Sequence, residues 1–166
     1  EVEKLGGIPV CYRTGNSYMK AKMREGDFAF GSELSGHVFF RDKFSGYDDG
    51  IYASLRLIEV LSNSNNTISD MLSDIVKYHS TPEIKIAISD DIKFNVIKRV
   101  EDYCKMKKYD IITIDGVKAF FEDGSALVRA SNTGPNITVR FEAKTKERME
   151  FIKSEFIELI DRIKKG

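Results

Sequence analysis

The strongest constraint on the fold is a series of short β-strand patterns in the second half of the chain. Four stretches, YDIITI, VKAFFE, SALVRAS and NITVRFEA, are rich in the β-branched and aromatic residues that strands favour. Asp115-Gly116 and Asp123-Gly124 separate the first three, and Asp-Gly is a typical hairpin turn. Because hairpins join antiparallel neighbours, the series predicts a mainly antiparallel sheet of four to five strands.

Two helices and a further strand accompany this series. EIKIAIS places alternate isoleucines on one side, as a half-buried strand does. Asp90 or Asp91 is expected to begin a helix whose inward residues are Ile92, Val96, Val100 and Tyr103 or Cys104. A final helix has its apolar stripe at Met149, Ile152, Phe156, Leu159 or Ile160, and Ile163. This half is therefore predicted to be an α+β domain.

The first half alternates strand and helix patterns, which favours an α/β class. Ile8–Arg13 is expected to be a strand, and Asn16 or Ser17 to cap a helix over Tyr18–Arg24. Two short apolar stretches, DFAFG and HVFF, then surround a polar loop. Two more helices are predicted, one in IYASLRLIEVLS with Ile51, Leu55, Ile58 and Leu61 on one stripe, and one in ISDMLSDIVKY with a capping box formed by Thr67 and Asp70.

The polar stretch HSTPE marks the boundary between the two patterns, because proline and polar residues are typical of linkers. We predict a first domain over residues 1–78, a linker over 79–83 and a second domain over 84–166. The chain opens with EVEKL-Gly-Gly, which reads as the end of a helix. We therefore expect the chain to be a fragment of a longer protein.

Composition disfavours several classes of partner. The 26 basic and 26 acidic side chains give a formal net charge of +0, so no long-range attraction draws the chain to nucleic acid or to an anionic membrane. No apolar run is long enough to span a bilayer, and a cytoplasmic location is expected. Cys11 and Cys104 are interpreted as two buried reduced thiols, with a disulfide between them as the less favoured alternative. His37 and His79 lack zinc-ligand spacing with these cysteines.

The segment RASNTGPNITVR gathers hydrogen-bond donors around a turn. Arg129 and Arg140 bracket Ser131, Asn132 and Thr133, and a Gly-Pro-Asn turn follows. Arginine forks, hydroxyls and backbone amides together suit a phosphate dianion. Taken alone, such a cluster is more often a plain strand connection, and each arginine could instead form a surface salt bridge.

A second loop, GSELSGH, places Glu33 and Ser35 between glycines. If the backbone is extended there, both side chains lie on one side, where a carboxylate and a hydroxyl would suit a sugar ring. A glycine-rich turn with an exposed Glu33 is the simpler alternative. His37 begins an apolar strand and is expected to be packed and hydrogen-bonded rather than catalytic.

These two loops together resemble one enzyme family. FGSELSGHVFF is similar to the sugar-binding loop G-E-M-S-G-H of the α-D-phosphohexomutases, the phosphomannomutase/phosphoglucomutase family, and LVRASNTGPNITVRFEA resembles that family's C-terminal phosphate-binding loop R-A-S-N-T-x-P. RTGNSYMKAKM, FSGYDDGIYASLRLIEVL and STPEI also resemble family segments, in the expected order. The resemblance covers nearly the whole chain and identifies it as most of domain 3 plus all of domain 4.

The resemblance implies a fold, a reaction and a set of contacts. The fold would be an incomplete domain 3, with a mixed sheet and helices, followed by domain 4. The reaction interconverts hexose 1-phosphate and hexose 6-phosphate through a phosphoserine and a bisphosphorylated intermediate, supported by Mg²⁺. Glu33 and Ser35 would contact the sugar, and the phosphate would be bound by Arg129, Ser131, Asn132 and Thr133. Accessory contacts are expected from Arg13, Asn16, His37 and Arg140.

The departures from the family pattern limit what this chain can do. The nucleophile loop T-A-S-H-N-P and the metal loop D-G-D-x-D-R are absent from the sequence. We therefore expect no catalytic residue and no metal ligand in this chain, and an inactive fragment whose parent holds Mg²⁺ elsewhere. Asn16 stands where the family usually has a histidine, and it cannot titrate. Arg13 stands where lysine is common and could still face a phosphate.

Two other functions remain open from the sequence. The chain could be a stand-alone sugar-phosphate binding module, although a missing part of domain 3 counts against this. A nucleic-acid-binding module is disfavoured by the balanced charge and the lack of a basic stripe. The parent is expected to be monomeric, whereas an exposed apolar face of the fragment could drive self-association. Whether the parent prefers mannose, glucose or glucosamine phosphates stays open.

Overall fold

The computed structural model describes residues 1–131 and 134–165. The chain divides into two compact units, Glu1–Ile75 and Val76–Gly166, which we call unit 1 and unit 2 and describe separately. Unit 2 contains the sheet that was expected from the strand patterns. Its strands are β3 (His79–Ser80), β4 (Ile84–Ala87), β5 (Asp110–Ile112), β6 (Val117–Phe121), β7 (Gly124–Ala130) and β8 (Asn136–Ala143).

The strands of unit 2 pair antiparallel throughout, in the order β3-β8-β7-β6-β5, with β4 also paired to β8. The predicted hairpins join β5 to β6 and β6 to β7. Gly116 has φ 81°, and a Cβ there would lie 2.4 Å from the Val128 carbonyl oxygen, so the first turn requires glycine.

The sheet has six strands in the described residues, one more than the upper expectation of five. The additional strand is β3, which was assigned to the linker. His79 and Ser80 pair with Ala143 and Glu142 of β8, and the Thr81 N–H donates to the Phe141 carbonyl. Pro82 then follows, and because proline has no N–H the ladder is interrupted before β4.

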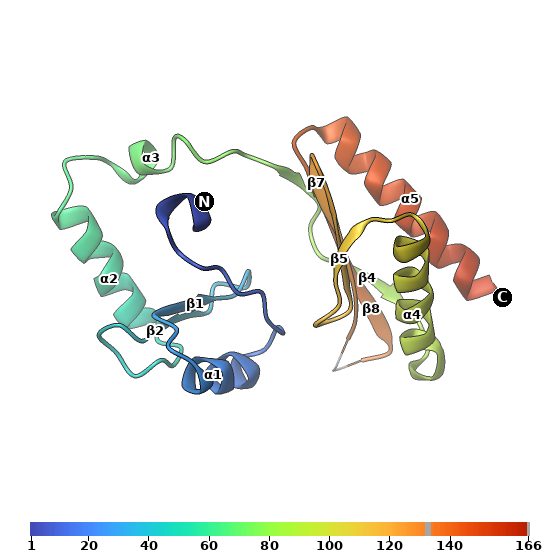
Figure 1. The fold of residues 1–166 in the computed structure, drawn as a ribbon, viewed down its shortest axis with the longest axis horizontal. Helices are drawn as coiled ribbons and strands as arrows, with labels where there is room; N and C mark the ends of the chain where they lie inside the picture. Colours follow the sequence, from blue (N-terminus) through green and yellow to red (C-terminus); the bar gives the residue numbers. More distant parts are fainter. Residues whose placement is uncertain (132–133, 166) are drawn as a thin grey trace. The chain divides into compact units, whose positions relative to one another are not determined.

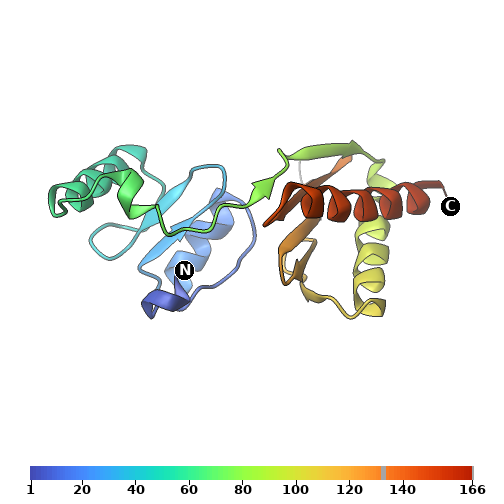
Figure 2. The same ribbon diagram turned by 90° about the horizontal axis from the view of Figure 1, so that it is seen from above.

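Two helices cover one face of this sheet (Figures 1 and 2), α4 (Asp90–Met106) and α5 (Lys146–Lys165). Their buried stripes meet inward-facing residues of the strands in one apolar core. This core includes Val96, Val100 and Cys104 of α4, Val117, Ala119, Ala126, Val128, Ile137, Val139, Phe141 and Ala143 of the strands, and Met149, Ile152, Phe156, Leu159 and Ile160 of α5. The predicted α+β class is confirmed.

One position of the α4 stripe differs from the expectation. Ile92 was expected to face inward, but its side chain is 40% exposed. Lys93 takes the inward position instead and is only 7% exposed. The buried residues of α4 are thus Lys93, Val96, Val100 and Cys104, which keeps the helical spacing but begins one residue later.

Unit 1 is built around a short hairpin of β1 (Phe30–Ser32) and β2 (Val38–Phe40), flanked by α1 (Asn16–Glu25) and α2 (Gly50–Ser62). The Asp49 side chain caps α2 by accepting from the Tyr52 N–H at 2.9 Å. Arg41 Nη1 donates to the carbonyls of Met23 and Gly26, which ties the end of α1 to the hairpin. Met23 and Phe39 are the residues buried between these elements.

Three local expectations for this part of the chain are wrong. Residues 8–13 form no strand, because Ile8 is 90% exposed and has no neighbouring strand among the described residues to pair with. The helix expected up to Tyr78 is only α3 (Ile68–Met71), although the predicted capping box of Thr67 and Asp70 is present. Cys11 is exposed rather than buried, whereas Cys104 is buried and burial raises its thiol pKa to about 11. A further 3-10 turn, η1 (Glu3–Leu5), opens the chain.

Candidate functional site

Asp48 organises the polar cluster of unit 1. Its Oδ2 accepts from His37 Nδ1 at 2.6 Å and from Asn16 Nδ2 at 3.4 Å, while its Oδ1 accepts from the Val38 N–H at 3.2 Å. Asp48 therefore joins the start of α1, the loop between β1 and β2, and the segment before α2. Two of the predicted accessory residues, Asn16 and His37, are thus brought together by a carboxylate for which the sequence predicted no such role.

The electrostatics of this cluster favour an ionised Asp48. The hydrogen bond from His37 is the largest cause that lowers the pKa of the Asp48 carboxyl, followed by the bond from the Val38 N–H. Both donors stabilise the charged form, so the carboxylate is held as an acceptor at neutral pH. It can therefore orient the His37 ring, whose Nδ1 is engaged by the contact.

The loop between β1 and β2 contains the residues that were predicted to bind the sugar, Glu33 and Ser35. The Glu33 N–H donates to the His37 carbonyl at 2.9 Å, and the Gly36 N–H donates to the Glu33 carbonyl at 3.0 Å, with Gly36 at φ 92°. The loop is therefore a tight turn, and Ser35 is exposed on it. Glu33 is not the exposed side chain of the simpler alternative, because its Oε1 is buried and has no hydrogen-bond partner among the described residues.

Arg13 lies on the segment before α1. Its guanidinium carbon is 4.3 Å from the centre of the Tyr18 ring, a cation–π geometry that holds the side chain against the helix. Its Nε is buried and, among the described residues, no acceptor meets it. Arg13 and Glu33 thus each hold one shielded polar atom, a donor and an acceptor respectively, that the described protein groups leave unsatisfied.

Arg129 and Arg140 lie on the sheet face of unit 2 opposite to its helices. The register pairs Arg129 with Thr138 and Arg140 with Leu127, so the two arginines are diagonal neighbours on β7 and β8. The prediction that Arg140 points away from Ile137, Val139 and Phe141 is confirmed by the burial of those three residues in the core.

Arg129 forms a salt bridge, as the alternative interpretation of these arginines allowed, and its partner is Asp115. Arg129 Nη1 lies 3.5 Å from Asp115 Oδ2, and both side chains are 20% exposed. Asp115 comes from the hairpin turn between β5 and β6, where the sequence indicated only a turn residue. This carboxylate holds the guanidinium at the end of β7, next to the loop that follows.

The loop after β7 is held by its own backbone and by neighbouring elements. The Ser131 N–H donates to the Asn136 carbonyl at 3.0 Å, the Asn136 N–H to the Gly134 carbonyl at 2.8 Å, and the Ile88 N–H to the Pro135 carbonyl at 2.9 Å. Asn132 and Thr133, both predicted to contact phosphate, lie outside the described residues. Arg129 and Ser131 are thus the described members of the predicted phosphate loop.

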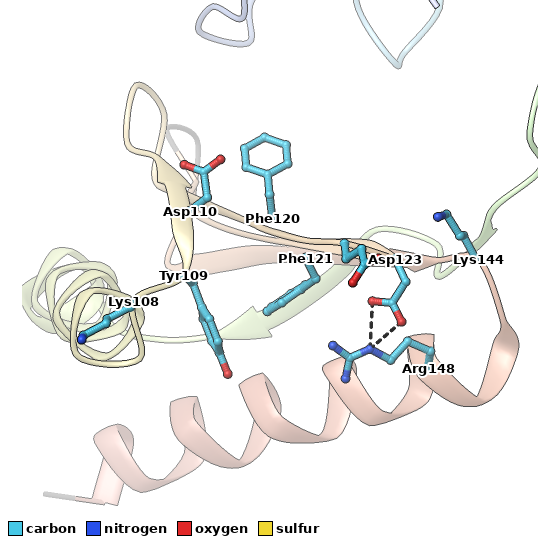
Figure 3. A pocket seen from close by; sticks show the side chains of 9 residues that line it. Lys108, Tyr109, Asp110, Phe120, Phe121, Asp123, Lys144 and Arg148 are labelled. Carbon is cyan, nitrogen blue, oxygen red and sulfur yellow. Dashed lines mark hydrogen bonds and ion pairs between the residues drawn. The ribbon is translucent and has the colours of Figure 1, made fainter.

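A hollow of about 590 Å³ lies elsewhere in unit 2, at the edge formed by β5 and β6 (Figure 3). Figure 3 shows Tyr109, Phe121 and Arg148 on the α5 side of the strands, with Asp110 and Phe120 on the other side. Arg148 Nε donates to both carboxylate oxygens of Asp123, at 3.0 and 3.1 Å. None of the predicted site residues lines this hollow. Two of the charged residues that do line it, Arg148 and Asp123, pair with each other.

Neither a metal cluster nor a membrane helix is found in the part of the chain that the structure describes. Residues 1–131 and 134–165 contain no group of three or more His, Cys, Asp or Glu side chains that could hold a metal ion. The Mg²⁺ that the family resemblance implies therefore has no fitting set of ligands among them. In the same ranges, none of the helices combines the length and the apolar character needed to cross a membrane.

Comparison with known proteins gives matches along nearly the whole chain. The family model described as "Phosphoglucomutase/phosphomannomutase, alpha/beta/alpha domain III" matches residues 1–78, and the model of the "C-terminal domain" of the same family matches residues 83–159. A phosphomannomutase/phosphoglucomutase of Pseudomonas aeruginosa strain PAO1 is 42% identical over 155 residues, which is 93% of this chain and 34% of that protein.

Two further matches agree. A phosphoglucomutase of Neisseria meningitidis serogroup A is 36% identical over 96% of this chain and 35% of that protein. The crystal structure of a phosphoglucomutase/phosphomannomutase family protein from Burkholderia thailandensis gives a TM-score of 0.87 at 34% identity, over 99% of this chain and 35% of that one. The chain spans about a third of the length of these relatives.

Proposed function

Because the chain belongs to the phosphoglucomutase/phosphomannomutase family, we propose that it supplies the sugar and phosphate contacts of a phosphohexomutase. The whole enzyme would interconvert hexose 1-phosphate and hexose 6-phosphate, with mannose or glucose phosphate as substrate. Unit 1 would contact the sugar hydroxyls through Glu33 and Ser35. Unit 2 would contact the phosphate through Arg129 and Ser131, with Asn132 and Thr133 as further contacts.

The buried, unpartnered Oε1 of Glu33 is the observation that carries this proposal. An acceptor that is shielded from water and lacks a donor destabilises the folded chain by about 1–3 kcal/mol. A sugar hydroxyl would supply the missing donor, and the neighbouring Ser35 is exposed and free to turn toward the same ring. A glycine-rich turn that only connects two strands is not expected to shield a carboxylate oxygen in this way.

The phosphate assignment is supported by the arrangement of cations on the β7–β8 face. Arg129 and Arg140 are diagonal neighbours, and Arg129 is held next to Ser131 by Asp115. Two guanidinium groups on one face can bind a dianion through several charge-assisted hydrogen bonds. Such donors can bind a phosphate in either orientation of the sugar, and a mutase must bind its sugar in both orientations.

The chemical step would use groups outside this chain. A phosphoserine donates its phosphoryl group to the free hydroxyl of a hexose phosphate, and the other phosphate of the resulting bisphosphate returns to the serine. Mg²⁺, held elsewhere in the whole enzyme, would stabilise charge on the phosphoryl group. We therefore propose that this chain binds substrate and lacks mutase activity by itself.

The test is an NMR titration of the ¹⁵N-labelled chain with mannose 1-phosphate, with inorganic phosphate and free mannose as comparison ligands. We expect a dissociation constant of about 1 mM, or roughly −4 kcal/mol, because only part of the site is present. Shifts at the backbone amides of Arg129 and Ser131 are expected with both phosphates. Shifts at Glu33 and Ser35 are expected only with ligands that contain the sugar.

Three variants sharpen this test. Arg129→Ala should abolish binding of both phosphates, whereas Arg99→Ala, which removes an exposed arginine of α4, should bind them as the unmodified chain does. Glu33→Gln should weaken mannose 1-phosphate and spare inorganic phosphate. If Arg129→Ala binds phosphate normally, the assignment of the loop is wrong, and equal losses for both ligands in Glu33→Gln would refute the sugar contact.

A further inference from the structure

Lys93 is the buried lysine in the first turn of α4, and its ammonium group reaches the loop that follows β7. Its Nζ donates to the Ser131 carbonyl at 2.9 Å and lies 3.4 Å from the Gly134 carbonyl. The same Nζ is 2.6 Å from Asp90 Oδ1, one helical turn earlier. The whole residue is 7% exposed, so the long side chain runs through the protein rather than over its surface.

The three contacts account for the full donor capacity of the ammonium group. A lysine ammonium has three protons and no acceptor, and here three protein oxygens surround it. It therefore has no proton left for a ligand. This distinguishes Lys93 from Arg129, which lies on the β7–β8 sheet face and has a broader fork of donors.

Two of the three acceptors stand on either side of Asn132 and Thr133. The carbonyl oxygens of Ser131 and Gly134 carry partial negative charge and would repel an anion approaching the loop. The Lys93 ammonium group contacts both of these carbonyl oxygens from the side of α4. Backbone hydrogen bonds join Ser131 to Asn136 and Asn136 to Gly134. Lys93 links these residues to a helix that is itself anchored in the core by Val96 and Val100.

We propose that Lys93 is a positioning residue for the phosphate loop. It links Ser131 and Gly134 to α4 and withdraws their carbonyl oxygens, so that these two positions are already arranged before phosphate arrives. Such prior ordering strengthens binding because less conformational entropy is lost in the bound state. The inference deepens the proposed function and rests on it for the identity of the ligand, although the link between Lys93 and the loop is testable without any ligand.

The first experiment compares the chain with Lys93→Met, which keeps the length of the side chain and removes its donors and charge. Without ligand, amide hydrogen exchange at Ser131 and Asn136, whose N–H groups form the backbone hydrogen bonds of the turn, should accelerate in Lys93→Met. With inorganic phosphate as the probe, the dissociation constant measured by NMR should rise by about tenfold. Normal exchange together with normal phosphate affinity in this variant would overturn the proposal.

Two control variants separate positioning from general stability. Val96→Ala removes buried volume from the same helix and should lower the stability of unit 2 while leaving the phosphate dissociation constant unchanged. Asp90→Asn removes the ion pair, whose carboxylate is 66% exposed, but keeps both carbonyl contacts, so phosphate affinity should change by less than about twofold. If Val96→Ala weakens phosphate as much as Lys93→Met does, Lys93 has only a structural role and the proposal fails.

A measurement on the unmodified chain covers the case in which Lys93→Met does not fold. In a chain with ¹⁵N-labelled lysine side chains, the Lys93 Nζ protons should exchange slowly with water and should stay in place when phosphate is added. Fast exchange without ligand, or displacement of these protons by phosphate, would overturn the positioning role. If the unmodified chain shows no phosphate-induced shifts, the proposed ligand is wrong, and the exchange rates still decide whether Lys93 holds the loop.

Discussion

The final helix α5 and the helix α2 of unit 1 have similar apolar stripes but opposite environments. In α5, Ile152, Phe156 and Ile160 are completely buried against the sheet of unit 2. In α2, Ile51, Leu55 and Ile58 are 79%, 57% and 59% exposed. A helical stripe therefore predicts the helix correctly, but its burial requires an apolar surface large enough to receive it.

The sheets explain the difference between the two helices. Unit 2 has a six-stranded sheet whose inward residues form one apolar cluster, and both of its long helices cover that cluster. Unit 1 has a two-stranded hairpin, and a surface of this size covers only Met23 and Phe39. The family model that matches this region describes an α/β/α domain, in which helices cover both faces of a sheet. The described hairpin is too small for that, so α2 stays uncovered.

The largest expected effect comes from the centre of unit 2. Phe156 is completely buried and its ring lies near the rings of Tyr103, Phe121 and Phe141. Phe156→Ala should destabilise unit 2 by about 3–5 kcal/mol, because it removes a large side chain and leaves a cavity. Urea unfolding followed by separate NMR signals from each unit would measure this.

Phe151→Ala is the matched control on the same helix. Phe151 is 60% exposed, so its removal should change the stability of unit 2 by less than about 0.5 kcal/mol. Similar losses in the two variants would mean that the contrast between buried and exposed stripes has no energetic basis.

How far the sequence predicts this molecule depends on the kind of residue. In unit 2 the strands and helices follow from apolar periodicity and from Asp-Gly turns, because nearly every local pattern there is satisfied by the core. Residues 8–13 have the composition of a strand and still form none, since strand formation needs a partner that a local pattern cannot reveal. The loops of the candidate site were predicted from their sequence motifs, because apolar periodicity alone does not identify a binding loop.

The residues that hold the site in place were the hardest to predict. Asp48 precedes a predicted helix and Asp115 lies in a predicted turn, yet they bind His37 and Arg129 from other parts of the chain. Lys93 occupies an inward position that an apolar pattern assigns to its neighbour Ile92. A charged residue in such a place is explained only by its partners, and two of the three partners of Lys93 lie 38 and 41 residues away in sequence.

The next largest effect is expected at Glu155, which joins α5 to α4 and to the segment just before β5. Tyr103 and Tyr109 both donate to Glu155 Oε1 at 2.8 Å. Glu155→Gln should destabilise unit 2 by about 1–3 kcal/mol, because it weakens two hydrogen bonds to a charged acceptor. Thermal unfolding at pH 7 would measure this loss, and an effect as small as that of Phe151→Ala would contradict the role of Glu155.

The same cluster predicts an alkaline limit for unit 2. Burial, and then the hydrogen bond to Glu155, raise the pKa of Tyr103 and of Tyr109 to about 12. Since tyrosine in the unfolded chain titrates near about pH 10, this stability is complete below that pH and is lost as pH rises toward 12. Tyrosinate absorbance and circular dichroism should change together in this window. Ionisation of both residues near pH 10 without unfolding would refute the prediction.

A smaller effect is expected in unit 1, at acid pH. The pKa of Asp48 is lowered chiefly by His37, so its contribution to stability is present above the ordinary value of 3.8 and is lost as pH falls through the lowered value. Asp48→Asn should remove this acid transition and should shift the NMR signals of His37 and Asn16 already at pH 7. An unchanged acid transition in the variant would show that another carboxyl controls it.

The smallest effect is expected at the exposed stripe of α2. Leu55→Gln keeps a good helix former and should change the stability of unit 1 by less than about 0.5 kcal/mol, because Leu55 is 57% exposed and loses little buried area. Val100→Gln, at a completely buried position of α4, should destabilise unit 2 by about 1–3 kcal/mol because it buries an amide without partners. Urea unfolding at several protein concentrations would test both. If Leu55→Gln destabilises unit 1 strongly, and more so as concentration rises, the stripe is covered by another copy of the chain, and the contrast between α2 and α5 would hold only for the separate molecule.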